Sequence, residues 1–117
     1  MRSKYHNRKV KRDGMVFDSK READRWTELK LLEKAGEITN LQRQVKFELL
    51  PKQYSKTEFT KARKPKVLER EVCYIADFVY QGSNGMVVED AKGFRTDDYK
   101  IKRKLALYML GIEIKEV

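Results

Sequence analysis

Apolar and polar positions follow a helical period soon after the start of the chain. The spacing predicts an amphipathic helix of about 16 residues, with these apolar positions on one face: Trp26, Leu29 and Leu32. Ser19 with Glu22 three positions later fits a capping box at its start, and Gly36 fits a C-terminal stop. Just before this helix, Asp13-Gly14 between short apolar runs predicts a small hairpin within residues 10–17.

After this helix, apolar runs at 44–50, 72–80 and 86–92 predict three strands. A second helix should begin at Thr96 and end at Gly111, and a final alternating run predicts a strand over 112–117. We expect this helix to bury one apolar stripe: Ile101, Leu105, Tyr108 and Met109. A helix between the last two strands favours a parallel crossover, whereas the earlier strands favour antiparallel pairing. The predicted fold class is α/β (α+β), a mixed sheet in the order αβββαβ flanked by helices.

The length of 117 residues predicts a single domain over 1–117. Within it, residues 1–17 form a basic N-terminal arm or hairpin, and residues 51–70 form a basic loop or an extension of the hairpin. No apolar run approaches the roughly 20 residues that span a bilayer, so we expect no membrane contact. Cys73 is the sole cysteine and the N-terminus has no apolar stretch, so we expect no internal disulfide, no secretory signal and a cytoplasmic location.

The net charge of +9, from 27 basic and 18 acidic residues, is concentrated in patches. Such patches attract a polyanion, which predicts nucleic acid as the partner. The candidate contacts are Arg8, Lys9, Lys11 and Arg12; Lys61, Arg63 and Lys64; and Arg95, Lys100, Arg103 and Lys104. Solvated surface charge is the alternative for each of them.

Asp77, Asp90 and Lys92 place charge in two apolar runs joined by a short turn. Asp90 and Lys92 are two apart and share a strand face. An even-length loop would bring Asp77 to that face, and an odd one would bring Glu89 instead. Asn84-Gly85 is typical of a two-residue turn, which favours Asp77.

These residue types suit Mg²⁺ beside a phosphate. The ion prefers carboxylate and carbonyl oxygens, here Asp77, Asp90 and the carbonyl of Ala91. Lys92 would orient a water or stabilise charge on the phosphate. The alternative is a surface ion pair between Asp90 and Lys92.

Two further residues are candidates for the same site. Glu22 is either only a helix cap or a carboxylate that faces the sheet with Trp26 and approaches the metal. Gln44 opens a predicted strand and would support the site from behind the ligands.

Ile75-Ala76-Asp77-Phe78 followed by Val88-Glu89-Asp90-Ala91-Lys92-Gly93 resembles the P-D…(D/E)-x-K signature of restriction-endonuclease-like nucleases. The predicted order αβββαβ is similar to their common core. More closely, the chain resembles a phage family of small proteins assigned to this PD-(D/E)XK superfamily. Ala76 stands where the signature has proline, a position that supplies backbone shape and no ligand.

The resemblance implies a Mg²⁺-dependent DNA endonuclease, with Mn²⁺ as a substitute, acting in the cytoplasm of a bacterial host. It assigns Glu22 as the helix acid, Asp77 and Asp90 as the acids of the signature, and Lys92 as its lysine. Small phage members also resemble Holliday-junction-resolving enzymes, which implies a homodimer and branched DNA. A non-catalytic nucleic-acid-binding protein and an RNA-directed nuclease are the alternatives.

Overall fold

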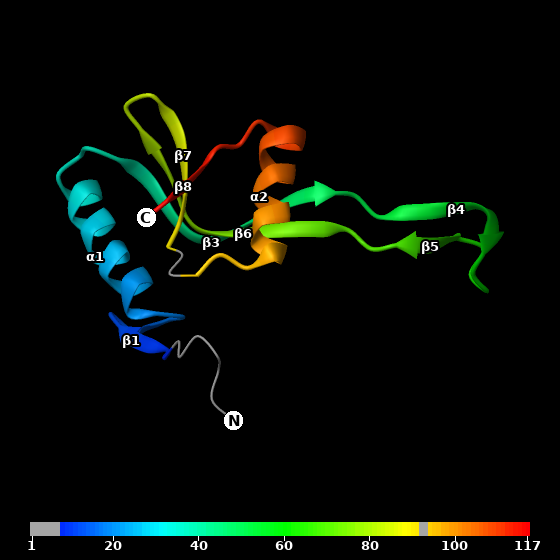
Figure 1. Ribbon diagram of the computed structural model, residues 1–117, viewed down its shortest axis with the longest axis horizontal. Helices are drawn as coiled ribbons and strands as arrows, with labels where there is room; N and C mark the ends of the chain where they lie inside the picture. Colours follow the sequence, from blue (N-terminus) through cyan, green and yellow to red (C-terminus); the bar gives the residue numbers. More distant parts are fainter. Residues whose placement is uncertain (1–7, 92–93) are drawn as a thin grey trace.

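The computed structural model describes residues 8–91 and 94–117, which form two helices and three sheets (Figure 1). The elements are β1 (Val10–Arg12), β2 (Met15–Phe17), α1 (Lys20–Lys34), β3 (Thr39–Leu50), β4 (Gln53–Phe59), β5 (Pro65–Glu69), β6 (Val72–Gly82), β7 (Gly85–Asp90), α2 (Asp97–Leu110) and β8 (Ile114–Glu116).

The central sheet has the strand order β3-β6-β7-β8. β6 pairs antiparallel with β3 and β7, and β8 lies parallel to β7 after the crossover through α2. Apart from the insertion of β4 and β5, the order of elements is the predicted αβββαβ. The mixed α+β class, the N-terminal hairpin β1–β2 and the parallel crossover are therefore confirmed.

Both helices begin and end at the predicted signals. Ser19 Oγ accepts from the Glu22 N–H at 3.1 Å, and Thr96 Oγ1 accepts from the Tyr99 N–H at 3.1 Å. Gly36 and Gly111 follow the helices with φ of 80° and 67°, the left-handed conformation that glycine adopts without steric cost. Short local signals therefore fix the position of each helix along the chain.

The core has two layers, one on each face of the central sheet, which lies between the helices in Figure 1. One layer packs α1 against the sheet and includes Phe17, Ala23, Trp26, Leu29, Phe78 and Tyr80. The other packs α2 against the opposite face and includes Leu49, Tyr74, Ala76, Val88, Tyr99 and Ala106.

The predicted apolar stripe of α2 was wrong except for Leu105, which packs partly buried against the core. Its buried residues are Tyr99 and Ala106, whereas Ile101 and Tyr108 are 57% and 86% exposed. The small Ala106 allows the helix to approach the sheet, and the Tyr99 hydroxyl donates to Glu116 of β8 at 2.8 Å. Polar anchoring of Tyr99 and close packing at Ala106 therefore decide which face is buried.

The segment between the first two core strands forms a hairpin, the second of its two predicted alternatives. β4 and β5 pair antiparallel and project away from the body as a two-stranded arm that continues from β3 and β6 (Figure 1). We call residues 53–69 the arm. Among the described residues, no helix is long and apolar enough to cross a membrane.

Candidate functional site

The β6–β7 hairpin has the register that the sequence favoured. Gly82 pairs with Gly85 around a two-residue turn, and Phe78 pairs with Glu89. Continued by one residue, this register places Asp77 opposite Asp90. Glu89 lies on the other face, where Arg25 of α1 contacts it through Nε and Nη2, both at 2.7 Å.

Asp77 lies where β6 meets both of its neighbours. Its Oδ2 accepts from the Ala91 N–H at 2.9 Å, and its Oδ1 lies 3.4 Å from Gln44 Nε2 of β3. Burial, the charge of Asp90 and a hydrogen bond with Asp90 raise the pKa of Asp77 from 3.8 to about 8, against the lowering effect of the Ala91 N–H. Two carboxyl groups thus share a poorly solvated space in which one favours holding a proton.

Asp90 is fully buried at the end of β7. Its Oδ2 accepts a 2.5 Å hydrogen bond from the Tyr74 hydroxyl, and its carbonyl accepts from the Val117 N–H at 3.0 Å. Burial and the adjacent carboxyl group raise the pKa of Tyr74, so the phenol remains a donor. Tyr74 thereby fixes the direction of the Asp90 carboxyl group.

Glu22 is 2% exposed and joins the cap of α1 to the sheet. Its Oε1 accepts from Arg43 Nη2 at 3.3 Å and from Gln44 Nε2 at 3.1 Å. Its Oε2 accepts from the Asp18 N–H at 3.3 Å. A regular capping box would instead use the N–H of Ser19, one residue later. The side chain therefore bonds the backbone just before α1, and through Gln44 it is linked to Asp77.

Gln44 joins the two acidic parts of the site, because its Nε2 lies within hydrogen-bonding distance of both Glu22 and Asp77. Its φ of 53° is unusual for a residue other than glycine, and it lies inside β3. Strained backbone of this kind is often retained where it aims a side chain.

β3 and β6 both change face at this point. In a regular strand alternate residues share a face, yet Leu41 of β3 packs on the α1 side and Val45 on the α2 side. Likewise, Ala76 of β6 packs on the α2 side and Phe78 on the α1 side. The two changes flank Gln44 and Asp77, which the register places opposite each other.

The donor set is suited to a hard cation, since carboxylate and carbonyl oxygens are the ligands of Mg²⁺. In the described part of the chain, however, no three acidic, histidine or cysteine side chains are arranged to hold a metal ion. A pair of carboxylates completed by waters and a phosphate matches the usual Mg²⁺ site. The raised pKa of Asp77 supports this fit, because a cation would relieve the repulsion between the two acids. Lys92 lies outside the described residues.

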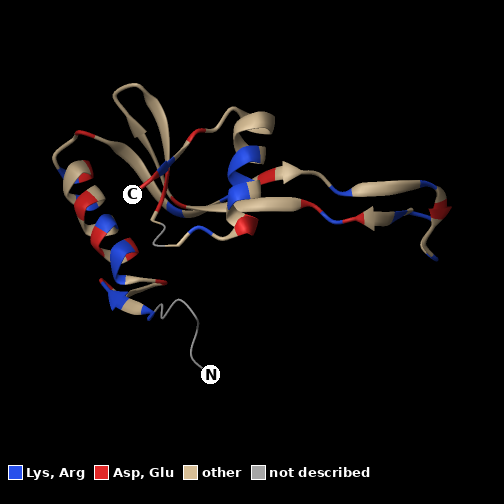
Figure 2. Cartoon of the chain, viewed as in Figure 1, with Lys and Arg blue, Asp and Glu red and all other residues tan. Residues whose placement is uncertain are grey.

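The predicted basic contacts are dispersed over the surface (Figure 2). Arg95 and Arg103 both bind Glu116, at 2.9 and 3.2 Å, while Lys100 and Lys104 are exposed on α2. In the N-terminal hairpin, Arg12 binds Asp24 at 2.8 Å. The remaining predicted contacts are exposed: Arg8, Lys9 and Lys11 at the N-terminal end, and Lys61, Arg63 and Lys64 at the turn of the arm.

Sequence reasoning missed Arg43 and Tyr74. Arg43 lies over the Phe17 ring, 4.0 Å from its centroid, and bonds Glu22. Tyr74 orients Asp90 from the neighbouring strand. Local sequence offers no signal for either role, because each contact joins segments that only the folded sheet brings together.

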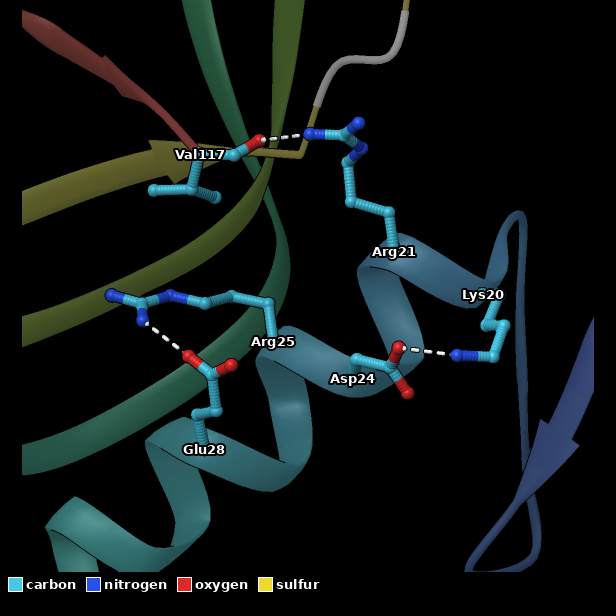
Figure 3. Close-up of a pocket in the computed structure, with 6 residues that line it drawn as sticks. All are labelled: Lys20, Arg21, Asp24, Arg25, Glu28 and Val117. Carbon is cyan, nitrogen blue, oxygen red and sulfur yellow. Dashed lines mark hydrogen bonds and ion pairs between the residues drawn. The ribbon is translucent and has the colours of Figure 1, made fainter.

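A surface pocket of about 450 Å³ lies between α1 and the C-terminal residue (Figure 3). Its charged groups largely satisfy one another, with Lys20 bound to Asp24 at 2.9 Å and Arg25 to Glu28 at 2.8 Å. Arg21 points to the Val117 carbonyl, 3.5 Å away. None of the acids of the candidate site lines this pocket.

Comparison with protein families gives a match over residues 2–114, to a family described as protein of unknown function (DUF1064). The chain belongs to the DUF1064 family. The match covers every acid of the candidate site in this DUF1064 protein, from Glu22 to Asp90. No curated protein and no solved structure matches the chain.

Proposed function

We propose that this DUF1064 protein is a divalent-metal-dependent DNA endonuclease of the PD-(D/E)XK type. The observation that carries the proposal is the pairing of the buried Asp90 with the partly buried Asp77, where burial and the charge of Asp90 raise the pKa of Asp77. A buried pair of acids is costly unless a proton or a cation neutralises it. The link through Gln44 to Glu22 adds a third carboxyl group to the same network.

Asp77, Asp90 and the Ala91 carbonyl would hold Mg²⁺ or Mn²⁺, with Glu22 close to the waters around it. When bound, the ion supplies a Lewis acid for phosphodiester hydrolysis. Arg43 and Gln44 hold the Glu22 carboxylate in place, and Tyr74 holds that of Asp90. Lys92, two residues after Asp90, is proposed to orient the attacking water or stabilise charge on the phosphate.

The proposed substrate is DNA, duplex or branched, and the excess of basic residues supports a polyanionic partner. Selection by DNA structure, including four-way junctions, and a homodimer with one site for each strand follow from the resemblance to junction-resolving enzymes.

The test is a panel of linear, nicked, flapped and four-way DNA substrates incubated with Mg²⁺ or with chelator. We expect cleavage only with the metal, and its loss in Asp77→Ala, Asp90→Ala and Lys92→Ala. Glu37→Ala removes an exposed acid after α1 and should cleave like wild type. Equal cleavage by wild type and Asp90→Ala would show that Asp90 is not part of the catalytic site.

A non-catalytic nucleic-acid-binding protein is the second candidate. It is favoured by the lack of a three-acid metal group among residues 8–91 and 94–117, and by the ion pair that already occupies Glu22. This function predicts shifts in DNA mobility without cleavage in any divalent ion. The same panel made of RNA tests an RNA-directed nuclease.

A further inference from the structure

The arm has no core of its own to explain its length. Every residue from 53 to 69 is exposed except Ser55, and β4 and β5 contact each other extensively but no other element to a comparable degree. Two-stranded hairpins of this kind are at best marginally stable in water. The arm nevertheless exposes four large apolar side chains: Tyr54, Phe59, Val67 and Leu68. A projecting element of this composition indicates a binding surface.

The charge of the arm identifies the chemistry of the partner. Residues 53–69 contain five basic and two acidic residues. Lys66 lies 3.4 Å from Glu58, but the other four make no ion pair with any described residue: Lys56, Lys61, Arg63 and Lys64. Exposed cations without counter-charges favour a polyanion over an ordinary protein surface.

Three of these cations are held together at the turn of the arm. Thr60 forms the turn with its backbone and its side chain: its N–H donates to the Lys64 carbonyl at 2.8 Å, its carbonyl accepts from the Arg63 N–H at 2.9 Å, and its Oγ1 accepts from the Lys64 N–H at 3.3 Å. Arg63 adopts a φ of 61° within it. The turn therefore places Lys61, Arg63 and Lys64 within four consecutive positions at the tip of the arm, where Figure 2 shows blue segments.

The arm is also continuous with the strands of the candidate site, because it connects β3, which carries Gln44, to β6, which carries Asp77. The chain advances 13 residues from Lys64 at the tip to Asp77, so at about 3.3 Å per residue the tip lies within about 43 Å of the site. That span equals about 13 base pairs of duplex at 3.4 Å per step. One duplex can therefore reach both places.

We propose that the arm is a DNA-binding element whose tip contacts backbone phosphates away from the acidic site. The inference rests on the proposed function for the choice of DNA, but it concerns binding and needs no cleavage. Because lysine and arginine at the tip would contact phosphates, the arm adds affinity that does not depend on base sequence.

The test is the binding of a labelled 30-base-pair duplex in chelator, measured by fluorescence anisotropy over a range of salt concentrations. For Lys61→Ala/Lys64→Ala we expect roughly tenfold weaker binding at low salt. The slope of log K against log salt should fall by about two, one for each lost phosphate contact. Lys30→Ala/Lys34→Ala removes the same charge from the exposed surface of α1 and should bind with the wild-type slope.

Lysine acetylation gives a second readout on the unaltered protein. Duplex DNA should protect Lys61 and Lys64 from the reagent and leave Lys34 reactive. An unchanged slope in the arm variant, or equal reactivity with and without DNA, would overturn the proposal, as would a change of oligomeric state in place of a change in DNA binding. Absence of cleavage by wild type would count against the nuclease alone, since these measurements contain no metal.

Discussion

Gln44 Nε2 lies 3.4 Å from Asp77 Oδ1, and these two residues mark the point where β3 and β6 change face together. The change releases both side chains from the regular alternation of the sheet. The same amide reaches Glu22 at 3.1 Å, so one side chain connects the acid of α1 with that of β6. The face change of β3 and β6 is therefore also what brings Gln44 next to both Glu22 and Asp77.

Replacement of Gln44 should separate the effect of its backbone from that of its side chain. Gln44→Ala and Gln44→Gly both remove the amide, so both should lose most of the proposed cleavage. Glycine relieves the left-handed conformation, so Gln44→Gly should be more stable to urea than Gln44→Ala by about 1 kcal/mol. Comparable cleavage by wild type and both variants would exclude a positioning role for the amide.

Asn40 provides a matched control in the same strand. It has a φ of 55° and is exposed. Asn40→Gly and Asn40→Ala should show a similar stability difference, while both keep full cleavage. If cleavage is lost in this pair as well, its loss in the Gln44 variants cannot be assigned to the amide of Gln44.

The stability of the metal-free protein should fall as pH rises from 3.8 toward 8. Burial and the nearby Asp90 raise the pKa of Asp77 in the folded state from 3.8 to about 8. Between these values the folded state keeps a proton that the unfolded state has released, so the free energy of unfolding decreases with pH. Asp77→Asn cannot titrate and should flatten this part of the curve. Urea unfolding in chelator at a series of pH values measures it.

Glu37→Gln is the control for that experiment, since it neutralises an exposed acid after α1. It should keep the wild-type dependence on pH. Parallel curves for wild type and Asp77→Asn would mean that Asp77 does not carry the extra proton.

Mg²⁺ should stabilise the protein more at pH 8 than at pH 6. The cation binds ionised carboxylates, so it competes with the proton on Asp77, and ligand binding to the folded state raises Tm. Thermal unfolding with and without the metal measures the difference at each pH. Asp77→Asn and Asp90→Asn should abolish the shift, and a shift that persists in both would place the binding of Mg²⁺ elsewhere.

The sequence was informative wherever a local signal determines structure. Ser19 and Thr96 start the helices, and the two-residue turn after Gly82 sets the register that brings Asp77 opposite Asp90. Each of these depends on residues close together in the chain. The face change at Gln44 could not be predicted, because regular alternation is the only pattern that a strand sequence encodes. For a similar reason the sequence does not decide between a loop and a hairpin for residues 51–70, because this segment has little periodicity.

The misplaced stripe of α2 gives a direct test of which helix face is buried. Ala106 is 0% exposed and Tyr108 is 86% exposed. Ala106→Leu should therefore destabilise the protein by about 1–3 kcal/mol through overpacking. Tyr108→Ala should change the stability by less than about 0.5 kcal/mol. Urea unfolding measures the loss in the free energy of unfolding for each variant. A larger loss in Tyr108→Ala than in Ala106→Leu would mean that the face with Tyr108 is the buried one.

Arg25 and Glu89 form the buried ion pair that joins α1 to β7 behind the acids. Glu89 is 0% exposed and also accepts from the Tyr80 hydroxyl. Burial opposes its ionisation, but the bonds from Arg25 and Tyr80 hold its pKa below the usual value. Arg25→Met would leave this buried carboxylate with only the Tyr80 hydroxyl and the more distant Lys115, 3.9 Å away, and should cost about 3–5 kcal/mol in the free energy of unfolding. The double variant Arg25→Met/Glu89→Met should recover most of that loss, because no buried charge remains unpaired.

Glu28→Ala is the matched control, because it removes the other partner of the same guanidinium. Arg25 binds Glu28 at 2.8 Å, but the side chain of Glu28 is 62% exposed. Exposed pairs contribute little, so this variant should lose less than about 1 kcal/mol. Urea unfolding of the four proteins at neutral pH measures the contrast. A loss in Arg25→Met no larger than that in Glu28→Ala would mean that the buried pair does not hold α1 against the sheet.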